Sequence, residues 1–575
     1  MSGRVQFVCD GAQVEVDAAP GETLLSVLRE RLGVTGVKDG CAPQGQCGCC
    51  TVLVDGAPRV ACVTPAARID GRQVTTIDGI EPAERDAIAA AFVASAGSQC
   101  GFCTPGIIVR AAALRAKGPV SDVAVDRALA AHLCRCTGWR TVVDAIHAVG
   151  ADDAGGRASA PAEAAAERAT LEGGVAQRVG SAVALGRGGF ADDTAPRDAL
   201  VAVPRPASSD AAAAEAAGIA WVVADSLLEA RDLAAKVQGR RTTADTRPPL
   251  ALPALPEGGV RLATSWVEPA YLEPDASWCV PGGAPASPLA NGGAFGGKAE
   301  SPVGPAAREL ADRFDRPVRV VFSREDVVRL GPKRAPFAGS AVLRDGILQV
   351  HGTFASSDAP PAPAPAAYAG LELVTDLRVA SVPGPATSRS VRASGFAELA
   401  VLVEGALDAA GFDRRVHVTD PRAEAVLLDN VITEPDGGAM AGARVVLDPT
   451  TGALERVVVR VAAGDPLDER VLRSYSIGAA HMALGWVLTE GLAVDRETGE
   501  VHDLTIRSFG VIRAKDTPPI EVTVVDDPGP PRARAGDAVF TAVAASAWNA
   551  LTRIEGTRPE AFPARDTPTA RMLRR

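Results

Sequence analysis

The cysteines are the residues of this sequence whose type and spacing most clearly serve chemistry. Ten of the 11 lie within the first 136 residues, and eight of these form two groups of four. A [2Fe–2S] cluster needs four thiolates, which a Cys-x2-Cys pair and two further cysteines can supply. We therefore expect two one-electron carriers close enough to exchange electrons. The expected ligands are Cys41, Cys47, Cys50 and Cys62 in the first group, and Cys100, Cys103, Cys134 and Cys136 in the second.

Structural zinc is the main alternative for each group, because zinc also binds four cysteine thiolates. Two such groups in tandem, with glycines inside the first ligand loop, favour iron–sulfur clusters. Cys49 lies between two expected ligands, and we expect it to be a small buried residue. Cys9 and Cys279 stand alone and are expected to be buried thiols that bind no metal.

Length, charge and hydropathy limit the class of protein. A chain of 575 residues is too long for one core and is expected to form several domains. Its net charge of -11 argues against nucleic-acid binding, which needs basic patches. No apolar stretch approaches the roughly 18 residues of a membrane helix. The N-terminus shows no apolar signal core and suggests a first strand, so thiols at cluster spacing favour the reducing cytoplasm over disulfides.

The expected elements that position the first group are short strands around one helix. Apolar residues alternate with polar ones in several short runs of residues 1–78, and a turn at Asp55-Gly56 separates two of these runs. The helix is expected to end before Gly33. The expected strands are Val5–Val8, Val14–Val16, Thr51–Val54 and Arg59–Val63, and the expected helix is Thr23–Arg31.

Residues 82–150 change to a helical period. Thr104-Pro105 opens one helix and Gly118 follows its end, which is the usual punctuation of a helix. The second cysteine group lies near the ends of these helices, where free backbone N–H groups can hydrogen-bond sulfur. The expected helices are Glu84–Ala96, Ile107–Ala116, Val123–His132 and Thr141–Val149.

Composition predicts a linker over residues 151–169, which are mostly Ala, Gly, Asp and Glu. Beyond it the chain is mixed α and β. The run Ala211–Ala217 predicts a short helix, and Pro360–Pro365 predicts an extended segment.

Three cysteine-bearing segments carry a family resemblance. VKDGCAPQGQCGCCTVLVDGAPRVAC (37–62), QCGFCTPG (99–106) and LCRCTGW (133–139) resemble the iron–sulfur portion of the molybdenum hydroxylases. That family includes xanthine dehydrogenase, aldehyde oxidase and bacterial carbon monoxide dehydrogenase. The resemblance implies an α+β multidomain protein with a β-grasp ferredoxin-like domain at 1–78 and a four-helix [2Fe–2S] domain at 79–150. The first loop departs from the family, because it has five residues in its first gap and Cys49 where alanine is usual.

Segments after residue 170 resemble the molybdopterin-binding subunit of the same family. They are GRGGFADDTAP (186–196), VEPAYLEP (267–274) and NGGAFGGK (291–298). The resemblance implies a reduced hammerhead-like domain at 170–263 and a shortened, mixed α/β molybdopterin-domain-like region at 264–575. It also implies a molybdopterin cofactor, on this chain or on a partner. The residues that it would place against this cofactor are Gln99, Gly292, Gly293, Phe295, Gly296, Gly297 and Arg392.

The same region departs from the family at functional positions. Ala299 stands where a substrate-holding glutamate is common, Met482 replaces an expected glutamine, and the GQG motif that grips the pterin is missing. Asp537 takes the place of the glutamate that acts as catalytic base, and its carboxylate is one methylene shorter in reach. Asp537 is therefore the candidate base, with the alternative that it caps a helix beginning near Ala538.

Three functions follow from the resemblance. The first is a [2Fe–2S] electron-transfer component that passes electrons from a molybdopterin centre to a flavin-binding subunit or other acceptor, with a full-length molybdenum subunit as a further partner. The second is a self-contained oxidoreductase that hydroxylates aldehydes or N-heterocycles. The third is a non-enzymatic scaffold or assembly protein, which two intact cysteine groups disfavour. We favour the first.

Overall fold

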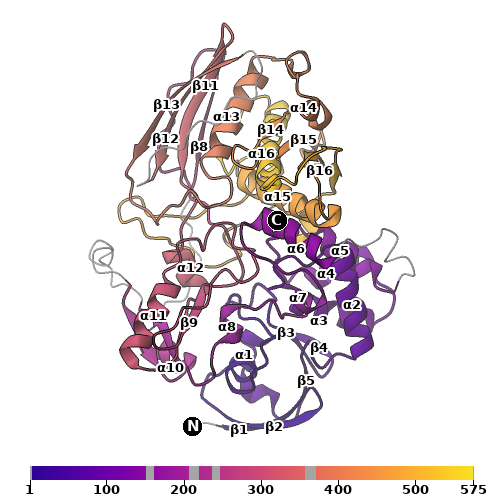
Figure 1. Ribbon diagram of the computed structural model, residues 1–575, viewed down its shortest axis with the longest axis vertical. Helices are drawn as coiled ribbons and strands as arrows, with labels where there is room; N and C mark the ends of the chain where they lie inside the picture. Colours follow the sequence, from indigo (N-terminus) through magenta and orange to yellow (C-terminus); the bar gives the residue numbers. More distant parts are fainter. Residues whose placement is uncertain (1–2, 151–160, 206–218, 236–245, 357–370, 574–575) are drawn as a thin grey trace.

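The computed structural model describes residues 3–150, 161–205, 219–235, 246–356 and 371–573. The cysteine-rich portion lies at one end of the molecule and the C-terminal region at the other (Figure 1). The segments Ala211–Ala217 and Pro360–Pro365 lie outside the described residues. In the described part of the chain, no helix is both long and apolar enough to cross a bilayer.

The N-terminal unit is a five-stranded sheet with a short helix against it. Its strand order is β2-β1-β5-β3-β4, in which the N-terminal hairpin pairs with β5 in parallel. Val5, Phe7 and Cys9 are buried because alternate residues of β1 face the core. The helix continues from α1 into a π-helical turn, η1, close to its expected position. Three of the expected strands are present, but the strand expected over Arg59–Val63 is wrong at its end, because β4 ends at Val60 and Ala61–Val63 form a 3-10 turn that carries Cys62. The bounds are β1 Gly3–Cys9, β2 Ala12–Ala18, β3 Thr51–Val54, β4 Ala57–Val60, β5 Gln73–Thr75, α1 Leu24–Ser26 and η1 Val27–Arg31.

Four helices follow, close to their expected positions. Glu81 accepts a hydrogen bond from the amide of Glu84 and so caps α2, and proline opens both α2 and α3. Ile88, Phe92, Ile107 and Trp139 are among the fully buried residues of this core. The bounds are α2 Pro82–Ala94, α3 Thr104–Arg115, α4 Asp122–Leu129 and α5 Arg140–Ala148.

The linker expected over 151–169 is wrong for its second part. Residues Ala162–Gly173 form helix α6, which packs against α15. Alanines favour the helical state, and the Arg168–Glu172 ion pair spans one turn of it with both side chains buried. The helix follows α5 in the chain but lies on the C-terminal region.

A small mixed sheet crosses the domain boundary expected after residue 263. Its order is β7-β6-β10-β9, with β10 parallel to β6 and antiparallel to β9. Strands from both sides of residue 263 therefore share one sheet. The bounds are α7 Ser181–Ala184, α8 Ala191–Thr194, β6 Leu200–Pro204, β7 Trp221–Ala224, α10 Leu227–Leu233, β9 Ala276–Cys279, α11 Val303–Phe314, β10 Val318–Val321 and α12 Arg324–Leu330.

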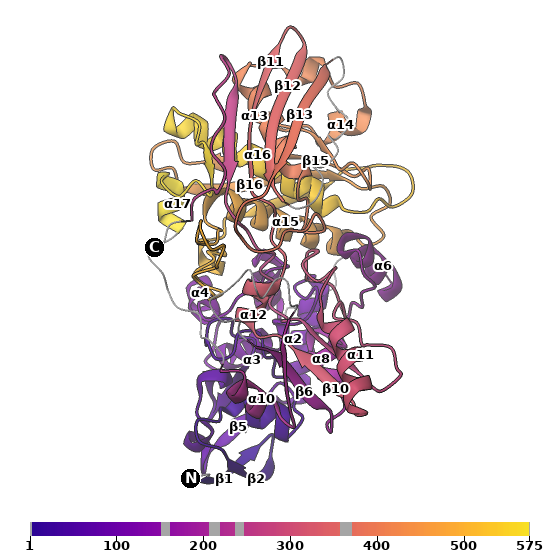
Figure 2. The same ribbon diagram turned by 90° about the vertical axis from the view of Figure 1, so that its left-hand side faces the viewer.

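The C-terminal region consists of two sheets separated by long helices. One sheet has the order β13-β12-β11-β8-β18 and lies far from the N-terminus (Figure 2), and the other has the order β14-β15-β16-β17. Helix α16 packs against α13, α15 and β15, so it joins the two layers. The bounds are β8 Val260–Thr264, β11 Phe337–Arg344, β12 Ile347–Ala355, β13 Glu372–Ala380, α13 Phe396–Ala409, α14 Pro421–Val426, β14 Ile432–Thr433, β15 Met440–Leu447, β16 Leu454–Ala462, α15 Glu469–Leu488, β17 Ile520–Val524, α16 Ala535–Glu555, β18 Ala561–Phe562 and α17 Pro568–Leu573.

Candidate metal centres

The first cysteine group lies in the loop before β3 and in the turn after β4. Its four thiols, of Cys41, Cys47, Cys50 and Cys62, are buried. The amide of Cys47 donates to the Cys41 sulfur at 3.3 Å, and the amide of Cys62 donates to the Cys50 sulfur at 3.4 Å. Hydrogen bonds from the thiols of Cys47 and Cys62 hold the pKa of Cys41 well below its usual value. Hydrogen bonding to Cys41 and burial raise the pKa of Cys47 and of Cys62, so Cys41 is the thiol of this group that is favoured as the thiolate a metal requires.

Two glycines allow this loop to fold tightly. Gly48 has a φ of +73°, and a Cβ there would lie 2.5 Å from the His132 ring and 2.6 Å from the Ala131 carbonyl oxygen. Gly45 has a φ of +65°, and a Cβ there would lie 2.9 Å from the Val63 side chain. Any other residue would push the loop away from its neighbours.

Cys49 is buried beside the first group. Its thiol lies 3.9 Å from the carbonyl oxygen of Cys47. The sulfur contacts among the four expected ligands link Cys41 to Cys47 and Cys62, and Cys62 to Cys50. The Cys49 thiol also contacts the Cys47 thiol, so Cys49 is a buried neighbour of one expected ligand.

The second cysteine group joins the start of α3 to the turn before α5. The sulfurs of Cys100 and Cys136 are 3.6 Å apart, and the thiols of Cys103 and Cys134 are also in contact. Hydrogen bonds from Cys103 and from the Thr137 hydroxyl, which lies 3.0 Å from the Cys134 sulfur, lower the pKa of Cys134 to about 6. Seven of the eight expected ligands are buried, and only Cys100 is partly exposed.

The two groups lie next to each other. The amide of Leu133 donates to the carbonyl oxygen of Cys47 at 2.9 Å, so one ligand loop hydrogen-bonds the other. A Cβ on Gly106, in the first turn of α3, would overlap the carbonyl oxygen of Gly48. The backbone that carries the first group is therefore in van der Waals contact with the backbone that carries the second.

The donor set fits iron–sulfur clusters. All eleven cysteines are free thiols. Among the described residues, no three His, Cys, Asp or Glu side chains converge on one ion position, whereas in the second group the cysteine sulfurs contact each other in pairs. A [2Fe–2S] cluster takes two thiolates at each iron, so paired sulfurs match it better than they match one central ion.

Comparisons with known proteins agree with this geometry. Residues 7–74 match the family described as 2Fe-2S iron-sulfur cluster binding domain, and residues 76–147 match the [2Fe-2S] binding domain. The chain is 37% identical over 146 residues to the xanthine dehydrogenase iron-sulfur-binding subunit of Escherichia coli O157:H7, which covers 25% of this chain and 91% of that subunit. The chain belongs to the molybdenum hydroxylase family. It carries two [2Fe–2S]-binding domains.

Beyond the iron–sulfur domains, the likeness to known proteins is one of fold. The aldehyde oxidoreductase of Megalodesulfovibrio gigas is 47% identical over 131 residues, which cover 22% of this chain and 14% of that protein. The solved aldehyde oxidoreductase from Desulfovibrio gigas superposes with a TM-score of 0.74 at 16% identity, covering all of both chains. At that identity the likeness shows the fold alone, including a molybdopterin-domain-like region after the iron–sulfur domains.

The loop that resembles the family's cofactor loop lies directly on the second cysteine group. Gly293 has a φ of +77°, and a Cβ there would lie 2.9 Å from the sulfur of Cys100. A Cβ on Gly292 would meet the Gln177 side chain at 2.6 Å, and one on Gly297 would meet Tyr271 at 2.6 Å. The loop thus packs against protein on several sides.

Gln99 is buried and binds protein groups. Its amide nitrogen donates to the carbonyl oxygen of Cys136 at 3.0 Å and to the Ser474 hydroxyl at 2.8 Å. The side chain therefore ties the second cysteine group to α15. The family resemblance predicts instead that the Gln99 side chain lies against a cofactor.

Asp537 and Arg392 face each other. Arg392 Nε lies 3.1 Å from Asp537 Oδ1, and the Arg392 guanidinium lies 4.9 Å from the centre of the Phe295 ring. Helix α16 begins at Ala535, so Asp537 occupies its first turn and is not its N-cap residue, as the alternative of a cap near Ala538 had it. In this structure Asp537 is therefore the ion-pair partner of Arg392.

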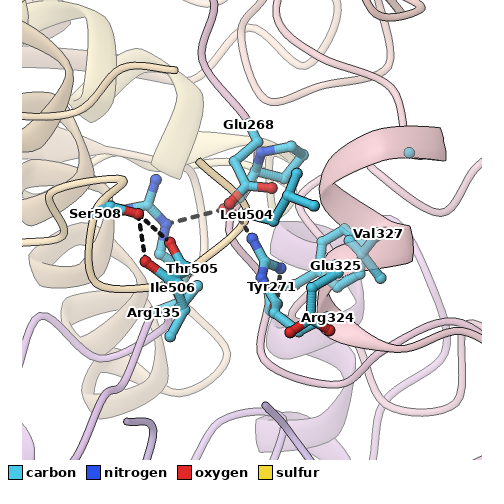
Figure 3. Close-up of polar contacts among 12 residues, drawn as sticks. Arg135, Glu268, Tyr271, Arg324, Glu325, Val327, Leu504, Thr505, Ile506 and Ser508 are labelled. Carbon is cyan, nitrogen blue, oxygen red and sulfur yellow. Dashed lines mark hydrogen bonds and ion pairs between the residues drawn. The ribbon is translucent and has the colours of Figure 1, made fainter. Parts of the chain in front are cut away.

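Sequence reasoning missed a set of buried arginine–carboxylate pairs beside these residues. Figure 3 shows Arg135, Glu268 and Arg324 where the iron–sulfur domains meet the rest of the chain. The same zone holds pairs whose members lie far apart in sequence, so no local spacing could reveal them. The pairs are Arg135–Glu490, Arg324–Glu268 and Arg334–Glu398.

Proposed function

We propose that this chain is the electron-transfer component of a molybdenum hydroxylase, passing electrons from a molybdopterin centre to a flavin or other acceptor. The observation that supports this most directly is the contact between the two cysteine groups, through the hydrogen bond from Leu133 to Cys47. Two one-electron carriers in adjacent loops form a path for electrons. The family is one of oxidoreductases, and its iron–sulfur relatives include proteins named as subunits.

In this proposal the chain's own residues bind and shield the two groups. The thiols of Cys41, Cys47, Cys50 and Cys62 would hold one [2Fe–2S] cluster, and those of Cys100, Cys103, Cys134 and Cys136 the other. When bound, each cluster supplies one-electron redox chemistry. Backbone amides directed at Cys41 and Cys50 stabilise negative charge on sulfur. Burial of seven of the eight thiols limits the access of water to both groups.

Partner subunits are part of the proposal. Electrons that arrive must come from a donor centre and leave to an acceptor, and the proposed acceptor is a flavin-binding subunit. Cys100 is the partly exposed ligand of the second group, and the exposed Val63 follows the first-group ligand Cys62 directly. Each group therefore lies near a surface at which electron exchange with a partner is feasible.

Electron paramagnetic resonance of the reduced protein tests this function. Purified anaerobically, the chain is expected to hold about four irons and to show two distinguishable signals on reduction with dithionite. The reduced protein is then expected to pass electrons to an added flavoprotein acceptor. Absence of iron, or a single signal with about two irons, would contradict the proposal.

A self-contained hydroxylase is the second candidate. It is supported by the likeness of fold over the whole chain, which includes the region equivalent to a molybdopterin domain. Substrate-driven reduction of the purified chain alone, with an aldehyde or an N-heterocycle, distinguishes it from the first candidate.

A further inference from the structure

The two loops that resemble the family's cofactor loops touch each other in this chain. The amide of Arg392 donates to the carbonyl oxygen of Phe295 at 3.0 Å. A Cβ on Gly296 would overlap the carbonyl oxygen of Ser390. The segments 291–298 and 388–395 are therefore packed backbone to backbone, without room for a group between them at these points.

Arg392, the cofactor-facing arginine of the resemblance, is fully engaged by protein. Asp537 pairs with its guanidinium at 3.1 Å, Phe295 lies under it at 4.9 Å, and the Met482 sulfur lies 3.7 Å from its Nη1. The exposed fraction of Arg392 is 8%. An arginine that neutralises its own carboxylate and stacks on an aromatic ring offers little to an anionic ligand.

A second buried pair lies beside the first. Arg334 binds Glu398 and donates to the carbonyl oxygen of Ala393 at 3.1 Å. Its guanidinium lies 4.4 Å from the centre of the Trp486 ring and 4.9 Å from that of Phe540. The exposed side-chain fractions of Arg334 and Glu398 are 4% and 0%. The pair fills the space between α13, α15 and α16.

A third pair joins the iron–sulfur domains to the same place. Arg135 Nη2 lies 2.8 Å from Glu490 Oε2, and Arg135 Nε donates to the Pro269 carbonyl oxygen at 3.0 Å. A Cβ on Gly485 would overlap the Glu490 carboxylate. Each of these arginines is matched by a carboxylate, so the pairs bring no net positive charge for a phosphate or a thiolate ligand.

The space left among these residues is small. The cavity between Arg135, Glu268, Phe295, Arg392 and Trp486 has a volume of about 20 Å³. The cavity between the second cysteine group and Gly292, Gly293 and Lys298 has a volume of about 10 Å³. A cavity of ~10–15 Å³ holds about one water molecule, whereas a ligand of cofactor size needs several hundred cubic ångströms, on the order of 300 Å³ or more.

We propose that this chain does not bind molybdopterin, because its own ion pairs, Arg392–Asp537, Arg334–Glu398 and Arg135–Glu490, occupy the position of the cofactor. The residues present do not fit the group that the family resemblance implies. The C-terminal region is then a scaffold that holds the second cysteine group, and the molybdenum centre that the chain serves lies on another polypeptide. This inference rests on the proposed electron-transfer function.

Metal and pterin analysis of the chain tests this inference. The chain is produced alone in a host that makes the cofactor, and a molybdenum hydroxylase with a complete cofactor domain is produced in the same host as the control. We expect about four irons per chain, with molybdenum and pterin at least tenfold below the iron-normalised content of the control. Molybdenum and pterin in equal amounts to the chain would overturn the inference.

The two proposals fail in different ways. Iron with stoichiometric molybdenum overturns only the closed cofactor position, and loss of iron overturns the electron-transfer function. A second measurement uses the Asp537→Asn variant. It is expected to melt at a lower temperature than the native chain, because Arg392 loses its charge partner, and to keep both reduced signals and the same molybdenum content. An unchanged melting temperature would contradict the structural role of the pair.

Discussion

Individual thiols in this chain differ in what the protein does to them. Cys134 receives hydrogen bonds from Cys103 and Thr137 that lower its pKa to about 6, which prepares it as a thiolate. Cys9 lies in a different environment, because burial and the neighbouring Asp10 carboxylate raise its pKa to about 12. The surroundings of each thiol thus set its pKa, even where the residue type is the same.

Replacing one expected ligand tests the assignment of the second cysteine group. Cys103→Ser removes a thiolate from the second group, so we expect iron to fall from about four to about two per chain. One of the two reduced resonance signals is expected to disappear and the other to remain. Cys9→Ser is the matched control and is expected to keep both signals. If Cys103→Ser left both signals unchanged, Cys103 would not be a ligand.

The buried Lys333 predicts that the free energy of unfolding of this chain depends on pH. Its ammonium group is buried, and burial lowers its pKa from 10.5 to about 8. Between these two values the unfolded chain binds more protons than the folded one, so the free energy of unfolding rises with pH from 8 to 10.5. A shift of about 2.5 pKa units corresponds to about 3 kcal/mol. The Lys333→Met variant removes this term.

The measurement is urea unfolding of both proteins at pH 7, 8.5 and 10. Relative to the native chain, Lys333→Met is expected to lose stability as pH rises through this window. A difference between the two proteins that does not depend on pH would show that Lys333 is not held with a lowered pKa.

At the scale of elements, ligand loops and glycine turns fit together with little tolerance. The loop 291–298 lies on the second cysteine group, and the first ligand loop lies on α3. Glycine is required where a backbone passes directly over a sulfur, as Gly293 does over Cys100. Such contacts couple the C-terminal region to the geometry of the second group.

Gly293→Ala tests this coupling. The added Cβ would lie 2.8 Å from the Cys100 Cβ and 2.9 Å from its sulfur, and the residue has a φ of +77°. We expect one reduced resonance signal to shift or broaden and the other to stay unchanged. Gly282→Ala is the control, because Gly282 has a φ of +68° with no atom within 4 Å of the added Cβ. Equal spectra for the two variants would argue against contact between the loop and the second group.

At the scale of the whole molecule, buried ion pairs hold the iron–sulfur domains on the C-terminal region. Arg135 lies between two expected ligands, Cys134 and Cys136, and reaches Glu490 355 residues later. Lys38 and Arg29 bind Asp193 across a second contact between the domains. The Arg135–Glu490 pair ties the second cysteine group to the segment that follows helix α15.

Breaking the Arg135–Glu490 pair is expected to destabilise the interface strongly. Arg135→Met leaves a buried carboxylate unpaired, which typically costs about 3–5 kcal/mol. The double variant Arg135→Met with Glu490→Leu is expected to recover much of that loss. Urea unfolding measures both. The control is Arg72→Met, which removes an exposed pair with Asp55 and is expected to cost less than about 1 kcal/mol. Equal losses in the single and double variants would contradict the pairing.

The sequence alone predicted the two iron–sulfur domains, most of their elements and the two groups of candidate ligands. Cys41, Cys47 and Cys50 lie in one loop, and Cys100 and Cys103 lie at one helix start, so local spacing encodes their chemistry. Strand alternation and helix punctuation in residues 1–150 are likewise local, and the predicted elements are present within a few residues. The family resemblance rested on the same local motifs.

The packing of the cofactor-like motifs in the C-terminal region, in contrast, depends on tertiary contacts. The motif 291–298 is present in the sequence, but its packing against 388–395 depends on contacts between segments about 100 residues apart. The ion pairs Arg334–Glu398 and Arg135–Glu490 join residues 64 and 355 positions apart, on elements whose relative orientation no local pattern specifies. The linker prediction is wrong at helix α6 for the same reason. An alanine-rich segment becomes a stable helix only where another element, here α15, gives it a surface to pack on.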